Sequence, residues 1–136
     1  MAAASARAAV ENADVVVTAT SAKDPVFEDV WISVGTHINA MGSNQAGKRE
    51  LPGAVLARAA VIAVDSFEQA RMESGDILIA EQEGSWNGAG LVELKDIASG
   101  KAQGRTHPNQ ITIFKSNGLA IEDVLAAGYV YEQVTG

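Results

Sequence analysis

Polar side chains gather at three places where an apolar run of the sequence stops. The three segments are Thr18-Ala19-Thr20-Ser21, Met41-Gly42-Ser43-Asn44 and Lys115-Ser116-Asn117-Gly118. Hydroxyl groups after a buried strand can bind a ribose or a phosphate, and they can equally cap the next turn. If the strands are parallel, the first two segments share one edge of the sheet and form a polar rim, where α/β proteins bind ligands. With Lys48 adding a positive charge, this rim favours a phosphorylated or nucleotide ligand over an apolar one.

The remaining polar residues do not indicate a second kind of chemistry. The two histidines are His37, within an expected strand, and His107, before a proline in a loop, and we interpret His37 as a structural or surface residue. Asp65 ends an expected strand, where carboxylates often cap the following helix. The sequence shows neither a hydrolytic triad nor a metal-ligand spacing. It contains no cysteine, which excludes disulfides and thiolate metal sites.

Composition indicates one soluble domain. The 136 residues are 47% hydrophobic, which is normal for a globular protein with its own core, and the aromatic fraction is only 5%. A net charge of −7 disfavours binding to nucleic acid or to an anionic membrane, because both require clustered Lys and Arg. No apolar run approaches the roughly 20 residues that span a bilayer, and no secretory signal is evident. We therefore expect a cytoplasmic α/β domain.

Short β-branched runs predict the strands that carry the polar segments. We expect strands at residues 15–19, 36–41, 60–65 and 111–114. The first of these, Val15 to Ala19, is apolar at nearly every position, as in a strand that is buried on both faces. The stretch from Thr36 to Leu51 is the central strand and its loop, although on local features alone an ordinary strand-to-helix connection fits equally well.

The segments between the strands predict helices. We expect them at residues 2–12, 53–59 (after Pro52), 66–74, 91–99 and 119–134, with one helical turn at 28–31. Ser66 and Gln69 fit a capping box, and Gly75 is a suitable terminator for that helix. Residues 76–80 fit either a strand or a helical turn, and 81–90 a connector with an exposed Trp86. Alternating helices and strands predict a parallel sheet with right-handed crossovers.

Four motifs carry a family resemblance. They are A-D-V-V-V-T-A-T-S (Ala13 to Ser21), H-I-N-A-M-G-S-N-x-x-G-K-R-E-L (His37 to Leu51), V-D-S (Val64 to Ser66) and G-R-T-x-x-x-x-I-T-I-F-K-S-x-G-L-A-I-E-D (Gly104 to Asp123). In order and spacing the chain resembles the ornithine cyclodeaminase/mu-crystallin family. The resemblance implies a Rossmann-type domain that binds NAD(H) or NADP(H), in a family that includes cyclodeaminases, alanine dehydrogenase-like enzymes and ketimine reductases.

The resemblance also implies roles for single residues. The implied cofactor contacts are Thr18, Thr20, Met41, Gly42, Ser43, Asn44, Lys48 and Ser116, and Asn117 matches a position that touches substrate. Asn44 stands where the cyclodeaminases have their catalytic aspartate. An amide cannot exchange a proton as a carboxylate does, which argues against cyclodeaminase chemistry. The asparagine is more compatible with a reductase, because there the cofactor carries out the hydride transfer.

The resemblance covers only the carboxyl-terminal portion of a full family member. The 136 residues contain no G-x-G-x-x-G/A phosphate loop, and they lack the family's substrate-binding Arg and Lys residues. We therefore expect a partial Rossmann-like domain over residues 1–136, without its first βαβ half, that binds NAD or NADP weakly and is not active alone.

Three functional alternatives remain from the sequence. The chain is a remnant cofactor-binding domain, a structural module without a cofactor, or an oxidoreductase half that requires a partner chain. An apolar strand at residues 15–19 without a neighbour on one side would expose a sheet edge. Such edges pair with other chains, so we expect a homo-oligomer, most simply a twofold dimer. A monomer whose own amino-terminal helix covers the edge is the alternative.

Overall fold

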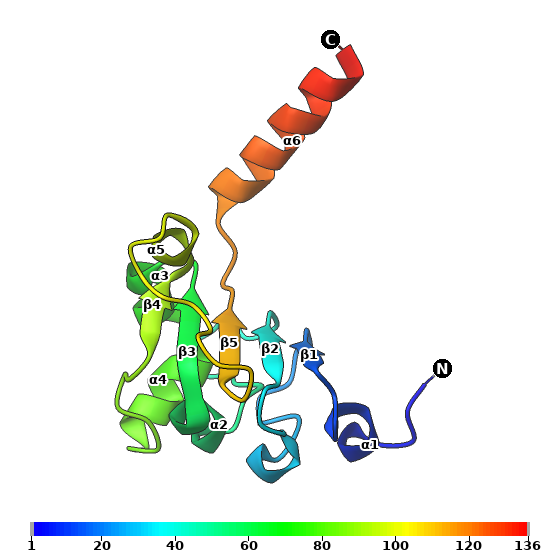
Figure 1. The fold of residues 1–136 in the computed structure, drawn as a ribbon, viewed down its shortest axis with the longest axis vertical. Helices are drawn as coiled ribbons and strands as arrows, with labels where there is room; N and C mark the ends of the chain where they lie inside the picture. Colours follow the sequence, from blue (N-terminus) through cyan, green and yellow to red (C-terminus); the bar gives the residue numbers. More distant parts are fainter. Residues whose placement is uncertain (1, 136) are drawn as a thin grey trace.

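A computed structural model describes residues 2–135, which form a parallel sheet of five strands in the order β1-β2-β5-β3-β4 (Figure 1). The strands are β1 (Val15–Thr18), β2 (His37–Ala40), β3 (Ala59–Val64), β4 (Leu91–Glu93) and β5 (Ile111–Lys115). The predicted parallel α/β fold is therefore confirmed. The predicted open edge is also confirmed for the described residues, within which β1 pairs only with β2.

One row of β-branched side chains crosses four strands on the buried face of the sheet. Val16 pairs with Ile38, which pairs with Ile113 of β5, and that residue pairs in turn with Ile62. Ile38 and Ile62 are fully buried. Side chains alternate between the two faces of a strand, so the neighbours of this row point to the opposite face.

That opposite face is open along β1. The exposed fractions of Val15 and Val17 are 57% and 62%. The prediction that this strand is buried on both faces is therefore wrong for the described chain. Its apolar composition reflects two faces that are both hydrophobic, although only one of them is covered here.

The helices lie mainly on the covered face. They are α1 (Ala6–Val10), α2 (Gly53–Arg58), α3 (Phe67–Glu73), α4 (Gly75–Gln82), α5 (Leu94–Ala98) and α6 (Ala120–Thr135), with a 3-10 turn η1 (Asp29–Trp31). The first four contribute Val10, Val55, Ala70 and Ile77 to the same core cluster as the strand residues. Burying these faces against the sheet removes apolar surface from water, which is the main driving force of the fold.

Several element boundaries differ from the predictions. The amino-terminal helix covers only Ala6–Val10 and begins after Ser5, whose Oγ accepts the Ala8 N–H at 3.1 Å. The predicted helix at 91–99 divides into a short strand, β4, and α5. Residues 76–80, which fitted a strand or a helical turn, are helical within α4.

Gly75 and Trp86 differ in role from what the sequence predicts. Gly75 begins α4 instead of ending the previous helix, and the structure needs a glycine there because a Cβ would lie 2.6 Å from the Gln45 carbonyl oxygen. Trp86 is not exposed. Its side chain is in the core, and its Nε1–H donates to the Ala89 carbonyl at 3.0 Å. A local sequence pattern reveals neither the close packing at Gly75 nor the burial of Trp86.

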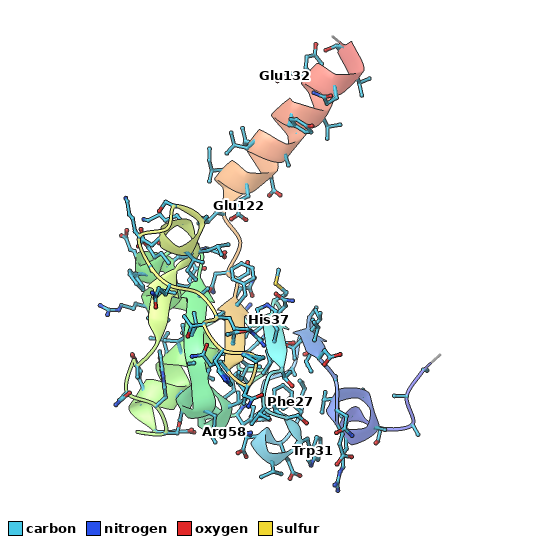
Figure 2. All side chains as sticks on the ribbon, viewed as in Figure 1. Phe27, Trp31, His37, Arg58, Glu122 and Glu132 are labelled. Atoms are coloured by element: carbon cyan, nitrogen blue, oxygen red, sulfur yellow. The ribbon has the colours of Figure 1, made fainter. Side chains whose placement is uncertain are left out.

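Helix α6 projects away from the sheet (Figure 1). Figure 2 shows its side chains, from Glu122 to Glu132, standing clear of the other elements. The helix itself was predicted, but the residues of its predicted apolar side are all exposed, namely Ile121, Val124, Leu125 and Val130. Between residues 2 and 135, no helix is both long and apolar enough to cross a membrane.

Candidate functional site

The three polar segments meet at one edge of the sheet. Thr18 at the end of β1 pairs with Ala40 of β2, and Ala40 pairs with Lys115 of β5. Because the strands are parallel, the loops that follow them leave the sheet side by side. We call this edge, made of Thr18–Ser21, Met41–Asn44 and Lys115–Gly118, the strand-end rim.

Glu50 lies beneath the rim and joins two of its segments. Its Oε1 accepts the Thr20 N–H at 2.5 Å and its Oε2 accepts the Gly42 N–H at 2.9 Å. The side chain is fully buried. Burial acts to raise the pKa of Glu50, but the hydrogen bonds to the ionised carboxylate outweigh it, and the pKa lies below its ordinary value. Glu50 is therefore a buried anion held by backbone donors.

Asp76 and Lys115 form a second buried link. Asp76 Oδ1 accepts the backbone N–H groups of Glu50 and Leu51 at 2.7 and 2.8 Å. Lys115 Nζ lies 3.8 Å from Asp76 Oδ2, and it donates to the carbonyls of Ser116 at 2.7 Å and Ala40 at 3.3 Å. Burial raises the pKa of Asp76 and lowers the pKa of Lys115, while their mutual attraction opposes both shifts.

Asp65 fixes the third segment. Its Oδ2 accepts the Ser116 hydroxyl at 2.8 Å, the Asn117 N–H at 2.8 Å and the Gly118 N–H at 2.9 Å. The interpretation of Asp65 as a helix cap is thus wrong, because Ser66 caps α3 by accepting the Gln69 N–H at 3.4 Å. Instead, the end of β3 holds the end of β5.

Comparison with known proteins identifies the domain that carries this rim. The sequence model of the ornithine cyclodeaminase/mu-crystallin family matches residues 1–136. The chain belongs to the ornithine cyclodeaminase/mu-crystallin family. It is 41% identical over 126 residues to a delta(1)-pyrroline-2-carboxylate reductase of Bacillus cereus, covering 92% of this chain and 38% of the relative.

Two solved structures show the same family architecture. The delta(1)-pyrroline-2-carboxylate reductase of Thermococcus litoralis, in complex with NADH and L-proline, has a TM-score of 0.87 and 42% identity over 94% of this chain and 40% of its own. An archaeal alanine dehydrogenase dimer with bound NAD has a TM-score of 0.83 and 40% identity over 93% and 39%. The chain therefore spans about two fifths of the length of the relatives that it matches.

Within this family domain, the residues with predicted cofactor roles differ in how accessible their side chains are to a ligand. Three of their hydroxyls are used inside the chain: Ser43 Oγ donates to the Lys48 carbonyl, Ser116 Oγ donates to Asp65, and Thr20 Oγ1 accepts the Ala22 N–H at 3.1 Å. Thr20, Met41 and Asn44 have exposed side chains. Lys48 is partly exposed, while Thr18 is buried in β1. The rim thus offers a ligand mainly backbone groups and the side chains of that exposed set.

Asn117, predicted to touch substrate, is partly buried at the end of β5. Its Nδ2 has no hydrogen-bond partner among residues 2–135, and neither does the second oxygen of Asp65. Buried polar atoms of this kind normally find a partner, so a ligand or a further part of a protein would satisfy them.

The charge beneath the rim of this family domain is net negative. Among residues 2–135, three buried carboxylates, those of Glu50, Asp65 and Asp76, accompany one buried cation, Lys115. Such an environment opposes a diphosphate and favours hydroxyl groups or a positively charged ring. Among residues 2–135, no group of three His, Cys, Asp or Glu is placed to hold a metal ion.

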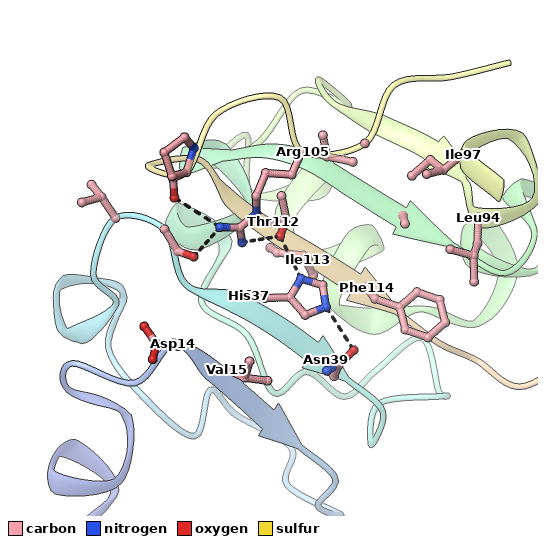
Figure 3. Close-up of a pocket in the computed structure, with 16 residues that line it drawn as sticks. Asp14, Val15, His37, Asn39, Leu94, Ile97, Arg105, Thr112, Ile113 and Phe114 are labelled. Atoms are coloured by element: carbon pink, nitrogen blue, oxygen red, sulfur yellow. Dashed lines mark hydrogen bonds between the residues drawn. The ribbon is translucent and has the colours of Figure 1, made fainter. Parts of the chain in front are cut away.

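A cavity lies elsewhere in the domain, on the open face of the sheet (Figure 3). It measures about 830 Å³ and contains a chain of hydrogen bonds. Arg105 Nη2 donates to Thr112 Oγ1 at 2.9 Å, which lies 2.8 Å from His37 Nδ1, and His37 Nε2 lies 3.3 Å from Asn39 Oδ1. His37 thus lies within a hydrogen-bonded chain on the open face, and its interpretation as a structural or surface residue stays a prediction. The described lining of this cavity includes no residue of the rim.

Proposed function

We propose that this chain supplies the nicotinamide and ribose side of a NAD(H) or NADP(H) site. The observation that supports this proposal is the meeting of three loops after β1, β2 and β5, with the residues that match the family's cofactor contacts. The reductase of Thermococcus litoralis with NADH and the archaeal alanine dehydrogenase with NAD share this part of the fold. The acidic charge beneath the rim fits the same end of the dinucleotide.

The residues favour a reductase or dehydrogenase over a cyclodeaminase. The amide of Asn44 cannot act as an acid or base, whereas a bound dinucleotide itself supplies the hydride. Asn44 and Asn117 would then orient a substrate by hydrogen bonding instead of moving its protons. The 136 residues by themselves are not expected to catalyse, because they contain neither a G-x-G-x-x-G/A phosphate loop nor the substrate-binding Arg and Lys residues of the family.

Affinity for the whole dinucleotide is expected to be weak. The 136 residues contain no G-x-G-x-x-G sequence, and the glycine turn before a helix is the usual anchor of the pyrophosphate. Without it we expect a dissociation constant of about 1 mM, or roughly −4 kcal/mol.

Calorimetric and NMR titrations test this proposal. NADH and NADPH should bind weakly with shifts at Thr20, Ser43 and Ser116, and nicotinamide mononucleotide should compete while AMP should not. Micromolar binding would show that the phosphate anchor is not needed. Competition by AMP alone would place the adenine half at this rim and overturn the assignment.

A second function is favoured by a separate observation. Val15 and Val17 form an exposed apolar strip on the edge strand β1, and α6 exposes its apolar side. Uncovered edges of this kind pair with other chains. We propose that the chain forms a twofold dimer through this edge, and the archaeal alanine dehydrogenase is itself a dimer. Light scattering of the 14.1 kDa chain should give twice that mass, and a monomer at high concentration would refute the dimer.

A further inference from the structure

We propose that Glu50 is the positioning residue of the strand-end rim, whose carboxylate sets the spacing of the loops after β1 and β2. This inference deepens the proposed dinucleotide site and rests on it for its functional consequence. Glu50 itself would not touch the ligand.

The carboxylate continues the pairing of β1 and β2 where the backbone ladder stops. The ladder ends at the pair of Thr18 with Ala40, where the Thr18 carbonyl accepts the Met41 N–H at 2.8 Å. The next donors, Thr20 N–H and Gly42 N–H, instead donate to the two oxygens of Glu50. Because one rigid carboxylate accepts from both loops, it fixes their separation. Hydrogen bonds to an ionised acceptor are roughly twice as strong as neutral ones.

The rim is built around this carboxylate, as Gly42 shows. A Cβ at position 42 would lie 2.5 Å from Thr20 N and would also overlap the Glu50 carboxylate. The backbone of Gly42 does not have a positive φ, so the glycine is required for space and not for conformation. The two loops therefore approach each other as closely as the bridging carboxylate allows.

Glu50 is in turn held from below. Its N–H and that of Leu51 donate to Asp76, which lies beside the Lys115 ammonium. The chain between Gly42 and Glu50 is thus a loop closed at both ends, and the Ser43 hydroxyl further closes it by donating to the Lys48 carbonyl. Asn44 and Lys48, which match cofactor positions, lie within this loop. A shift of Glu50 would therefore move the cofactor residues before it disturbed the apolar core.

The test compares Glu50→Gln with a matched control, Glu83→Gln, in the 136-residue chain. Glu83 has the same side chain as Glu50 but is half exposed. Its Oε2 lies 2.6 Å from Nη1 of Arg49, the residue that precedes Glu50. The Thr20 and Gly42 N–H groups donate to different oxygens of Glu50, and in glutamine one of these oxygens becomes an NH2 group. Only one of the two N–H groups therefore keeps its acceptor. In Glu50→Gln we expect an upfield shift of the Thr20 or Gly42 amide proton, or both, with core amides such as Ile113 unchanged. NADH affinity should fall about tenfold, since small misplacements of a site carry large costs. Glu83→Gln should change neither.

The outcomes separate the two proposals. If the wild-type chain shows no NADH-induced shifts, the cofactor site fails, while the two amide signals still report on Glu50. If Glu50→Gln is folded with wild-type Thr20 and Gly42 signals, or keeps its NADH affinity, the positioning role is wrong. A purely structural role would lower the melting temperature and leave that affinity unchanged.

The wild-type chain provides a second measurement if Glu50→Gln does not fold. As pH falls, the amide protons of Thr20 and Gly42 should titrate together, with a midpoint below the ordinary carboxyl value, because both donate to one carboxylate whose pKa is lowered. The nearby Asp76, whose pKa is raised, should titrate separately at higher pH. Two different midpoints for the two amides would overturn the proposal.

Discussion

Replacing Lys115 by methionine tests the charged layer beneath the rim. Lys115 is 1% exposed, and its ammonium is the one cation near Asp76 among the buried side chains of residues 2–135. Lys115→Met keeps most of the side-chain volume and removes the charge. The Asp76 carboxylate then remains buried with only the backbone N–H groups of Glu50 and Leu51 as partners.

The expected cost follows from the loss of one member of a buried pair. Such changes cost about 3–5 kcal/mol, because an uncompensated charge is left in the interior. The two backbone donors still solvate Asp76, so we expect the lower end, about 3 kcal/mol. For 136 residues, the unfolding entropy is roughly 0.29 kcal/mol/K. The melting temperature should therefore fall by about 10 °C at pH 7.

The pH dependence has a definite sign. Burial already holds the pKa of Asp76 above its ordinary value, and loss of the Lys115 charge raises it further. A raised folded-state pKa destabilises the folded protein above that pKa, and protonation relieves the cost as pH falls through it. The stability difference between wild type and Lys115→Met should accordingly shrink as the pH falls from 7 through the raised pKa of Asp76. Urea and thermal unfolding followed by circular dichroism measure it.

The double variant Lys115→Met with Asp76→Asn is the control. The amide oxygen introduced by D76N can still accept both N–H groups without a buried charge, so the double variant should recover much of the lost stability. The reasoning is refuted if Lys115→Met is as stable as wild type at pH 7. It is equally refuted if the double variant is no more stable than the single one.

Two further predictions concern the rim and the open edge. Gly42→Ala should cost about 1–3 kcal/mol and weaken NADH binding, because the methyl group would overlap Glu50, whereas Gly47→Ala, with open space around it, should change stability little. Val17→Lys should convert the dimer to a monomer with its melting temperature little changed, while Val30→Lys, at a similarly exposed valine away from β1, should remain dimeric. A dimeric Val17→Lys chain in light scattering would place the interface elsewhere.

Much of the fold could be predicted because local residue types determine it. The β-branched runs around Val16, Ile38, Ile62 and Ile113 are strands and pair in parallel as the alternation of elements indicates. The strand β4 was missed because it has only three residues and leads directly into α5, so its apolar residues resemble one continuous helical pattern. The burial of Trp86 in the core cluster depends on tertiary packing, which no local pattern contains.

The candidate site was predicted only at its surface. The polar strand ends are visible as hydroxyl and amide residues after apolar runs, and the structure brings them together. Glu50 stands in the charged run Lys48-Arg49-Glu50, which resembles a solvated surface. Its partners are backbone groups, one of them 30 residues away, and backbone groups have no sequence signature. The one available signal was Gly42, since a glycine after a strand can mark a close backbone approach.

Buried charged side chains of residues 2–135 link the strand ends at the rim. Glu50 joins β1 to β2, Lys115 joins β2 to β5, and Asp65 joins β3 to β5, so three of the four neighbouring pairs of strand ends have a buried charged link. A surface that is held in this way needs no ligand to form, which lowers the entropy cost of binding. Its charge is nevertheless wrong for a diphosphate, so we expect the nicotinamide end of a dinucleotide to be recognised here and its phosphates to be held by other residues. This preference for the nicotinamide end over the phosphates follows from the carboxylates beneath the rim. A variant that bound the phosphates here would have to lose those carboxylates, and the same carboxylates hold the rim in place.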